Sequence, residues 1–178
     1  MDRVNKSTEG IITASRRVLR AEVCVVSVGV GLVLAVMLPL FRLWDLRPRV
    51  PILYRGDAVL MMGAFKNMLL TGWYFSSELL GVPYGQDLRD FPAVGDLFHL
   101  MVSWVLVMIT RDPAQAFNAF YLASFVTVFL GAFTSCRMLA VSPRSSLVVG
   151  VLYTFLPYHV LHGPGHLFLS SYGAVPLW

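Results

Sequence analysis

The chain has 178 residues, of which 57% are hydrophobic and 13% are charged, and its mean hydropathy is +0.68. These values exclude an ordinary soluble domain and are typical of a protein that crosses a membrane several times. The formal net charge is +4, but the basic residues are dispersed or lie beside apolar segments. This distribution excludes a nucleic-acid surface and indicates a topology with the positive charge on the cytoplasmic side.

The amino-terminal part begins with a basic arm, residues 1–20, which we expect to stay in the cytoplasm. A run without charges follows, and the first transmembrane helix is predicted at residues 21–41. Such a run can cross a hydrocarbon core of about 30 Å. A cleaved signal peptide is the competing interpretation. The run is long for a signal core, however, and no small-residue cleavage site follows it before Trp44.

Residues 42–112 are predicted to form an extracytoplasmic loop that carries two surface helices. The first, residues 57–71, has apolar side chains at helical spacing, with a few polar ones among them. The second, residues 94–110, holds only about 14 uncharged residues, which is short for a spanning helix. If this second segment did span, Arg137 and Arg144 would lie outside, so the positive-inside rule favours the surface placement.

The remaining chain supplies two more predicted transmembrane helices. The second, residues 113–136, leads through a cytoplasmic loop, residues 137–145, to a third and shorter one, residues 146–161, which Pro157 should bend. Residues 162–178 form an outer turn and the start of a further apolar segment. The predicted fold is therefore an all-α integral membrane protein with three transmembrane and two interfacial helices. Because the chain ends inside an apolar run, we expect it to be part of a larger protein.

Aromatic side chains recur every three or four residues along the second predicted transmembrane helix. This pattern is typical of a stripe that packs against other helices or faces lipid. The stripe comprises Phe117, Phe120, Tyr121, Phe125, Phe129 and Phe133.

The predicted topology gathers acidic and imidazole side chains from separate segments on the outer face of the membrane. This convergence was not used to derive the topology, and it indicates a functional site there. The residues concerned are Asp57, Asp87, Asp90, Asp96, His99, His159, His162 and His166.

Asp57 is the first candidate, because it opens the first surface helix. It is either a helix cap, although Leu60 stands where a capping box would need Glu or Gln, or a general base or metal-binding carboxylate at the membrane surface. Asp87 and Asp90 flank Arg89 in a turn-rich stretch, residues 81–92, for which no regular structure is predicted. Together with Asp96 they are solvated carboxylates, or one of the three helps Asp57 to hold a divalent cation, Mg²⁺ or Mn²⁺.

Three histidines, His159, His162 and His166, look at first like a metal site. The intervening Gly-Pro-Gly breaks the helical spacing, which favours hydrogen bonding or phosphate contact over zinc coordination. Arg55 and Arg89 are further candidates for contacting phosphate, and their alternative role is to reach the lipid headgroups.

This layout resembles the amino-terminal module of the GT-C superfamily of polytopic membrane glycosyltransferases. The shared features are a basic arm and single helix, an outer loop with Gly-Asp before an amphipathic helix, and two later helices that end in Cys136-Arg137-Met138-Leu139 and Leu156-Pro157-Tyr158-His159. The segment GWYFSSELLGVPYGQDLRDFP is also similar to the first loop of bacterial YfhO-like membrane proteins.

The resemblance implies a multi-pass protein of the cytoplasmic membrane that transfers a sugar from a polyprenyl-phosphate donor to a glycan or protein acceptor on the outer face. It also implies that an acidic residue of the first outer loop, here Asp57, activates the acceptor, in some members with a divalent metal. The alternative from another class is a non-catalytic scaffold, lipid-binding or transport component that uses the same outer cavity.

Overall fold

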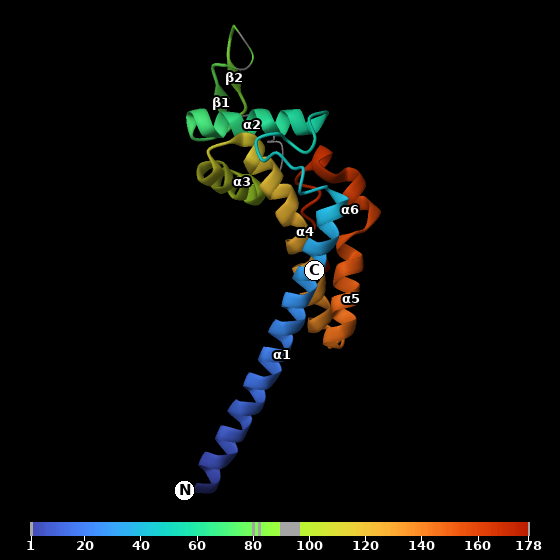
Figure 1. Ribbon diagram of the computed structural model, residues 1–178. Coiled ribbons are helices and arrows are strands. Elements are labelled where there is room, and N and C mark those ends of the chain that lie inside the picture. Colours follow the sequence, from blue (N-terminus) through green and yellow to red (C-terminus); the bar gives the residue numbers. More distant parts are fainter. Residues whose placement is uncertain (1, 80, 82, 90–96, 178) are drawn as a thin grey trace.

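The computed structural model is mostly helical (Figure 1). The structure describes residues 2–79, 81, 83–89 and 97–177. Three helices pack side by side, one of which extends alone far beyond the other two toward the amino terminus, and two others lie at one end of them. The first three are α1 (Asp2–Leu40), α4 (Pro113–Met138) and α5 (Pro143–Thr154), and the other two are α2 (Asp57–Thr71) and α3 (Leu97–Thr110).

Two helices are long and apolar enough to cross a membrane: residues Leu19–Leu40 of α1 and the whole of α4. A signal sequence near the amino terminus and a buried core helix would also have these properties, so length and composition alone do not distinguish them from membrane-spanning helices. The two helices differ in their surroundings, since 17% of the 18-residue apolar window of α1 is buried and 67% of that of α4 is. Helix α1 also begins earlier than the predicted transmembrane segment and includes the basic arm.

The segment predicted as a single third helix is divided in two. Helix α5 begins at Pro143, capped by the Ser142 hydroxyl, which accepts a hydrogen bond from the Ser145 N–H at 3.2 Å. It ends at Thr154, and the separate helix α6 (Pro157–His162) begins with Pro157 at its first position. Proline has no N–H to donate and clashes with the preceding turn, so it starts a new helix here instead of bending the old one.

Helix α2 lies across one end of the bundle, with α3 beneath it (Figure 1). A two-stranded antiparallel hairpin projects beyond α2 and consists of β1 (Ser76–Ser77) and β2 (Gln86–Asp87). The residue Gly72, in the left-handed conformation, ends α2, and the Trp104 indole of α3 donates to its carbonyl at 2.8 Å. This end of the molecule therefore combines two crosswise helices with a polar loop.

The aromatic stripe of α4 packs inside the bundle. Of its two predicted orientations, toward other helices or toward lipid, it therefore has the first. All six of its side chains are buried, the most exposed of them at 5%. Phe129 shows why the helices approach closely: a Cβ on Gly29 of α1 would lie 2.1 Å from its ring, and one on Gly150 of α5 would lie 3.0 Å from it. Two glycines thus accommodate one phenylalanine between three helices.

An ion pair fixes the end of the bundle opposite to α2. Arg137, near the carboxyl end of α4, places Nη2 2.6 Å from Oε1 of Glu22 in α1. Arg137 also donates to the carbonyl of Val141 in the short loop before α5. The antiparallel packing of α1 and α4 therefore puts this charged cluster far from the α2 end.

Candidate functional site

A cavity of about 540 Å³ opens at the α2 end of the bundle, where four separate parts of the chain meet. Its walls come from the residue after α1, the loop before α2 with the first residue of that helix, one turn of α4, and α6 with the turn that follows it. The apolar part of the wall includes Phe41, Ile52 and Val160, and the polar part comprises Arg55, Asp57, Tyr121 and His166.

Asp57 and His166 contact each other in this cavity, with 3.0 Å between Asp57 Oδ2 and His166 Nδ1. Asp57 is the first residue of α2, and Gly56 occupies the cap position without a side-chain cap bond. The carboxylate therefore does not cap its own helix but is directed to a histidine more than one hundred residues later in the chain. About half of each side chain is exposed, so the pair is open to a ligand entering the cavity.

A short turn brings His166 to Asp57. After α6, the 3-10 turn η1 (Gly163–His166) reverses the chain, and Gly163 begins it with φ of 32°. A Cβ on Gly163 would lie 3.0 Å from the Tyr121 hydroxyl oxygen. The absence of a side chain at this position lets the turn pass over Tyr121 and places His166 beside α2.

Tyr121 is the site residue that sequence reasoning missed, because its ring belongs to the aromatic stripe. The ring is fully buried and packs edge-on against Phe41 and Phe125, as a stripe member should. Its hydroxyl, however, has no hydrogen-bond partner among the described residues. Such an orphaned donor costs about 1–3 kcal/mol of stability. The available signal was a single hydroxyl within a run of phenylalanines.

Asn118 holds the loop that leads to Asp57. It lies in α4, is 3% exposed, and bonds three backbone groups of the loop. Its Nδ2 donates to the carbonyls of Pro48 at 3.2 Å and Val50 at 2.8 Å, and its Oδ1 accepts from the Ile52 N–H at 2.9 Å. One turn of α4 therefore carries both a wall of the cavity and the residue that fixes the neighbouring loop.

His159, a predicted site residue, lies in the helix packing and not in the wall of this cavity. It is fully buried, stacks on Phe125 at 3.8 Å, and places Nε2 2.8 Å from the Ser124 hydroxyl. Its Nδ1 is 2.9 Å from the Thr154 carbonyl. Both ring nitrogens are therefore occupied in joining α6 to α4 and α5.

The other predicted residues are distributed as follows. Asp87 and Arg89 lie on the exposed hairpin, 3.7 Å apart, and neither lines the cavity. Asp90 and Asp96 lie outside the described residues, and so does the side chain of His162. Arg55 does line the cavity. Of the predicted set, the structure thus brings together Arg55, Asp57 and His166.

A divalent cation would need several oxygen or nitrogen ligands at this site. Within the described ranges, no group of three His, Cys, Asp or Glu side chains is placed to hold a metal ion. Asp57 and His166 supply two such groups, and they contact each other. The described residues therefore do not by themselves make the cation site that the sequence suggested.

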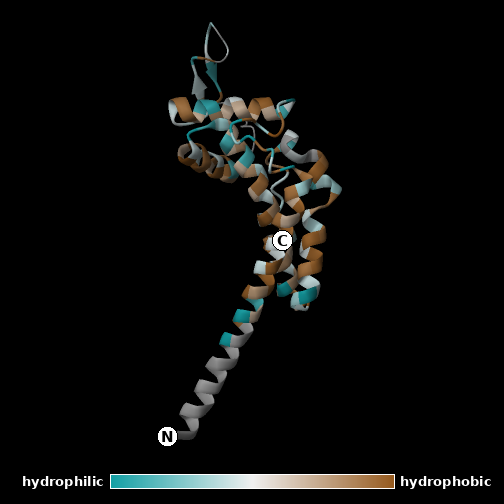
Figure 2. Cartoon of the chain, in the orientation of Figure 1, coloured by the Kyte–Doolittle hydropathy of each residue, from teal (hydrophilic) through white to brown (hydrophobic). Residues whose placement is uncertain are grey.

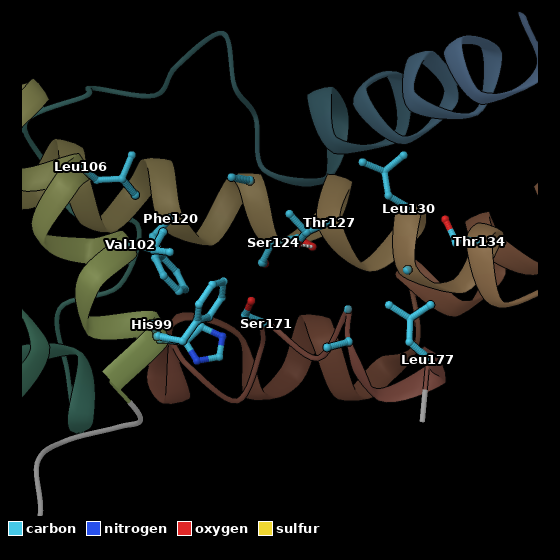
Figure 3. Close-up of a pocket in the computed structure, with 15 residues that line it drawn as sticks. His99, Val102, Leu106, Phe120, Ser124, Thr127, Leu130, Thr134, Ser171 and Leu177 are labelled. Carbon is cyan, nitrogen blue, oxygen red and sulfur yellow. Dashed lines mark hydrogen bonds between the residues drawn. The ribbon is translucent and has the colours of Figure 1, made fainter. Parts of the chain in front are cut away.

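A second cavity, also of about 540 Å³, lies between α3, α4 and the carboxyl-terminal segment (Figure 3). Its wall is almost entirely apolar, with the hydroxyls of Ser124, Thr127 and Ser171 along it. His99 lies at one end, stacked on Phe168 at 5.4 Å with an interplanar angle of 20°. The two cavities are lined from different faces of α4, since Tyr121 lines the first and Phe120 the second.

Comparisons with known proteins give no relative for this chain. No protein-family model, no curated protein and no solved structure matches it significantly. The fold and the site described above therefore define the chain as a mostly helical protein in which an Asp–His pair lines a cavity of mixed polarity.

Proposed function

We propose that the chain is an integral membrane protein of the cytoplasmic membrane, with its amino terminus in the cytoplasm. The apolar side chains exposed on the outside of the bundle support this, because a soluble monomer rarely leaves so many uncovered. In Figure 2 hydrophobic residues predominate along the bundle, between the hairpin and the polar start of α5. The exposed apolar side chains include Val28, Leu32, Leu34, Val36, Leu38 and Leu40 of α1, Phe98, Met101, Trp104 and Ile109 of α3, and Val148 and Leu152 of α5.

In this proposal α1 and α4 cross the membrane, and α5 and α6 together make the third crossing. Helix α5 has 12 residues, about 18 Å, and is too short alone for a core of about 30 Å. Helix α3, with 14 residues, lies against α2 at the outer surface. The Glu22–Arg137 pair then faces the cytoplasm, and the Asp57 cavity faces outward.

We infer that the function is that of a membrane glycosyltransferase, which moves a sugar from a polyprenyl-phosphate donor to a hydroxyl acceptor on the outer face. The observation that carries this inference is the Asp57–His166 contact at the wall of a cavity that also holds Arg55. A carboxylate held through one oxygen by a histidine keeps its other oxygen available to take a proton. The resemblance to GT-C enzymes, in which an acid of the first outer loop has this task, agrees with the arrangement.

The proposed step balances as a simple displacement. The acceptor oxygen attacks the anomeric carbon, and its proton passes to the free oxygen of Asp57. The bond between the anomeric carbon and the phosphate oxygen breaks, and the electron pair leaves with the lipid phosphate. Arg55 would offset the negative charge that develops there. No part of this step depends on a metal.

The function is tested by sugar transfer in membrane vesicles that contain the full chain. Vesicles supplied with a polyprenyl-phosphate donor carrying a radiolabelled hexose or pentose should pass the label to an acceptor fraction. Vesicles from cells without the protein provide the background. Labelling that stays at background with every donor would contradict the proposal.

The second cavity favours one alternative function, the binding of a lipid chain without catalysis. Its wall is apolar over nearly its whole length and offers few groups that could recognise a polar ligand (Figure 3). A protein that only bound lipid would use this cavity and have no need of the Asp57–His166 contact. The transfer assay above separates the two functions.

A further inference from the structure

We propose that Tyr121 binds the acceptor: its hydroxyl donates a hydrogen bond to a hydroxyl oxygen of a glycosyl or polyol group held in the Asp57 cavity. The inference rests on the proposed function and deepens it, because it specifies the chemistry of the acceptor. The evidence for it is the position of the Tyr121 hydroxyl group.

The Tyr121 hydroxyl contributes nothing to the packing of the bundle that a phenylalanine would not. The ring makes the contacts, against Phe41, Phe125 and the edge of His159. The described residues contain three buried side-chain polar atoms without a partner, on Asn67, Ser103 and Tyr121. Among these three residues, Tyr121 is the one that lines the Asp57 cavity. Buried polar groups in folded proteins are nearly always paired, so a partner from a ligand is the natural explanation.

The surroundings of the hydroxyl indicate which kind of ligand fits. It lies against the Gly163 turn, where a Cβ would come within 3.0 Å of it, so only a residue without a side chain fits beside the oxygen. The same turn carries His166, and His166 holds Asp57. An oxygen bound to Tyr121 would therefore belong to a molecule that can also reach the Asp57 carboxylate.

The charges of the cavity favour a neutral acceptor with several hydroxyl groups. Tyr121 offers a donor and the Asp57 carboxylate an acceptor, which together match two hydroxyl groups of one sugar or polyol. An anionic group beside Asp57 would meet like charge, whereas Arg55 on the same wall suits the lipid phosphate of the donor. The acceptor hydroxyls are thereby assigned to Tyr121 and Asp57, and the donor phosphate is assigned to Arg55.

The first test measures thermal unfolding of the full chain in detergent micelles. Tyr121→Phe removes an unpartnered hydroxyl, so the midpoint should stay the same or rise by a few degrees. The matched control is Tyr172→Phe, which removes a hydroxyl that does donate, to the Tyr153 carbonyl at 3.0 Å, and should lower the midpoint by about 2–4 °C. A midpoint for Tyr121→Phe that falls as far as that of the control would overturn the proposal.

The second test measures binding with methyl α-glucoside, methyl α-mannoside and glycerol as the probes, each at millimolar concentration. At least one of these probes should raise the unfolding midpoint of the wild-type protein and of the Tyr172→Phe protein. The affinity of the Tyr121→Phe protein for the same probe should be about tenfold lower, equivalent to about 1.4 kcal/mol. Equal stabilisation of all three proteins, or none of the wild type by any probe, would overturn the proposal. If Tyr121-dependent binding occurs in a protein that transfers no sugar, the enzymatic function fails and the acceptor site stands.

Discussion

Replacing Asp57 with Asn is expected to lower sugar transfer by the full chain at least about a hundredfold, because the variant lacks the group that accepts the proton. The amide has the same shape, and its oxygen can still accept the hydrogen bond that His166 Nδ1 now makes at 3.0 Å. Insertion and folding should therefore stay normal. The measurement is the initial rate of label transfer in vesicles that contain equal amounts of each protein.

The matched control for this variant is Glu78→Gln, which neutralises an exposed acid at the same end of the molecule. Glu78 follows β1 in the hairpin and does not line the cavity. Its replacement should leave transfer within about twofold of the wild type, since an exposed charge at a distance is screened by solvent. If Asp57→Asn retained more than half of the wild-type rate, Asp57 would not be the base and the proposed step would be wrong.

Asn118→Leu should cause the largest loss of stability, about 3 kcal/mol or more. Leucine fills the space but leaves two carbonyls and one N–H of the loop without their present partners, and each such group costs about 1–3 kcal/mol when buried. The loop it holds includes Arg49, which is exposed and is followed by Val50. Limited trypsin digestion in detergent should therefore cut after Arg49 faster in the variant than in the wild type.

The matched control here is Asn67→Leu, which removes the other buried asparagine that holds a loop. Asn67 donates to the carbonyls of Trp73 at 3.4 Å and Ser76 at 2.7 Å, at the base of the hairpin. That variant should also be less stable, but cleavage after Arg49 should stay slow because Asn118 still holds its loop. Equal cleavage in both variants would show that Asn118 does not hold the loop that leads to Asp57.

The helices were the part of this fold most open to prediction, because apolar runs report them directly. The range 57–71 coincides with α2, whose left-handed Gly72 marks a clear end. The division between α5 and α6 was harder, since Pro157 permits either a bent helix or a new one, and tertiary packing decides between them. The two-residue strands of the hairpin carry no periodic signal, so the sequence offered no means to predict them.

The candidate site was open to prediction only where a charged residue stood out from an apolar background. Arg55, Asp57 and His166 were found in this way, and the cavity contains all three. His159 was expected beside them because the predicted topology places it on the outer face, but its ring is buried in the bundle and contacts Ser124. Tyr121 and Asn118 act through contacts with distant segments, which sequence spacing does not reveal.

The central claim is that the Asp57 cavity and the end of the bundle that carries Arg137 and Arg144 lie on opposite sides of the membrane. The most direct test places a single cysteine at Asp87, on the hairpin, or at Arg144, at the start of α5; both Asp87 and Arg144 are exposed. The two native cysteines, Cys24 and Cys136, are first replaced by Ser. A membrane-impermeant maleimide should label the cysteine at 87 in intact cells and the cysteine at 144 only after the membrane is permeabilised. Labelling of both positions in intact cells, or of neither, would contradict the account.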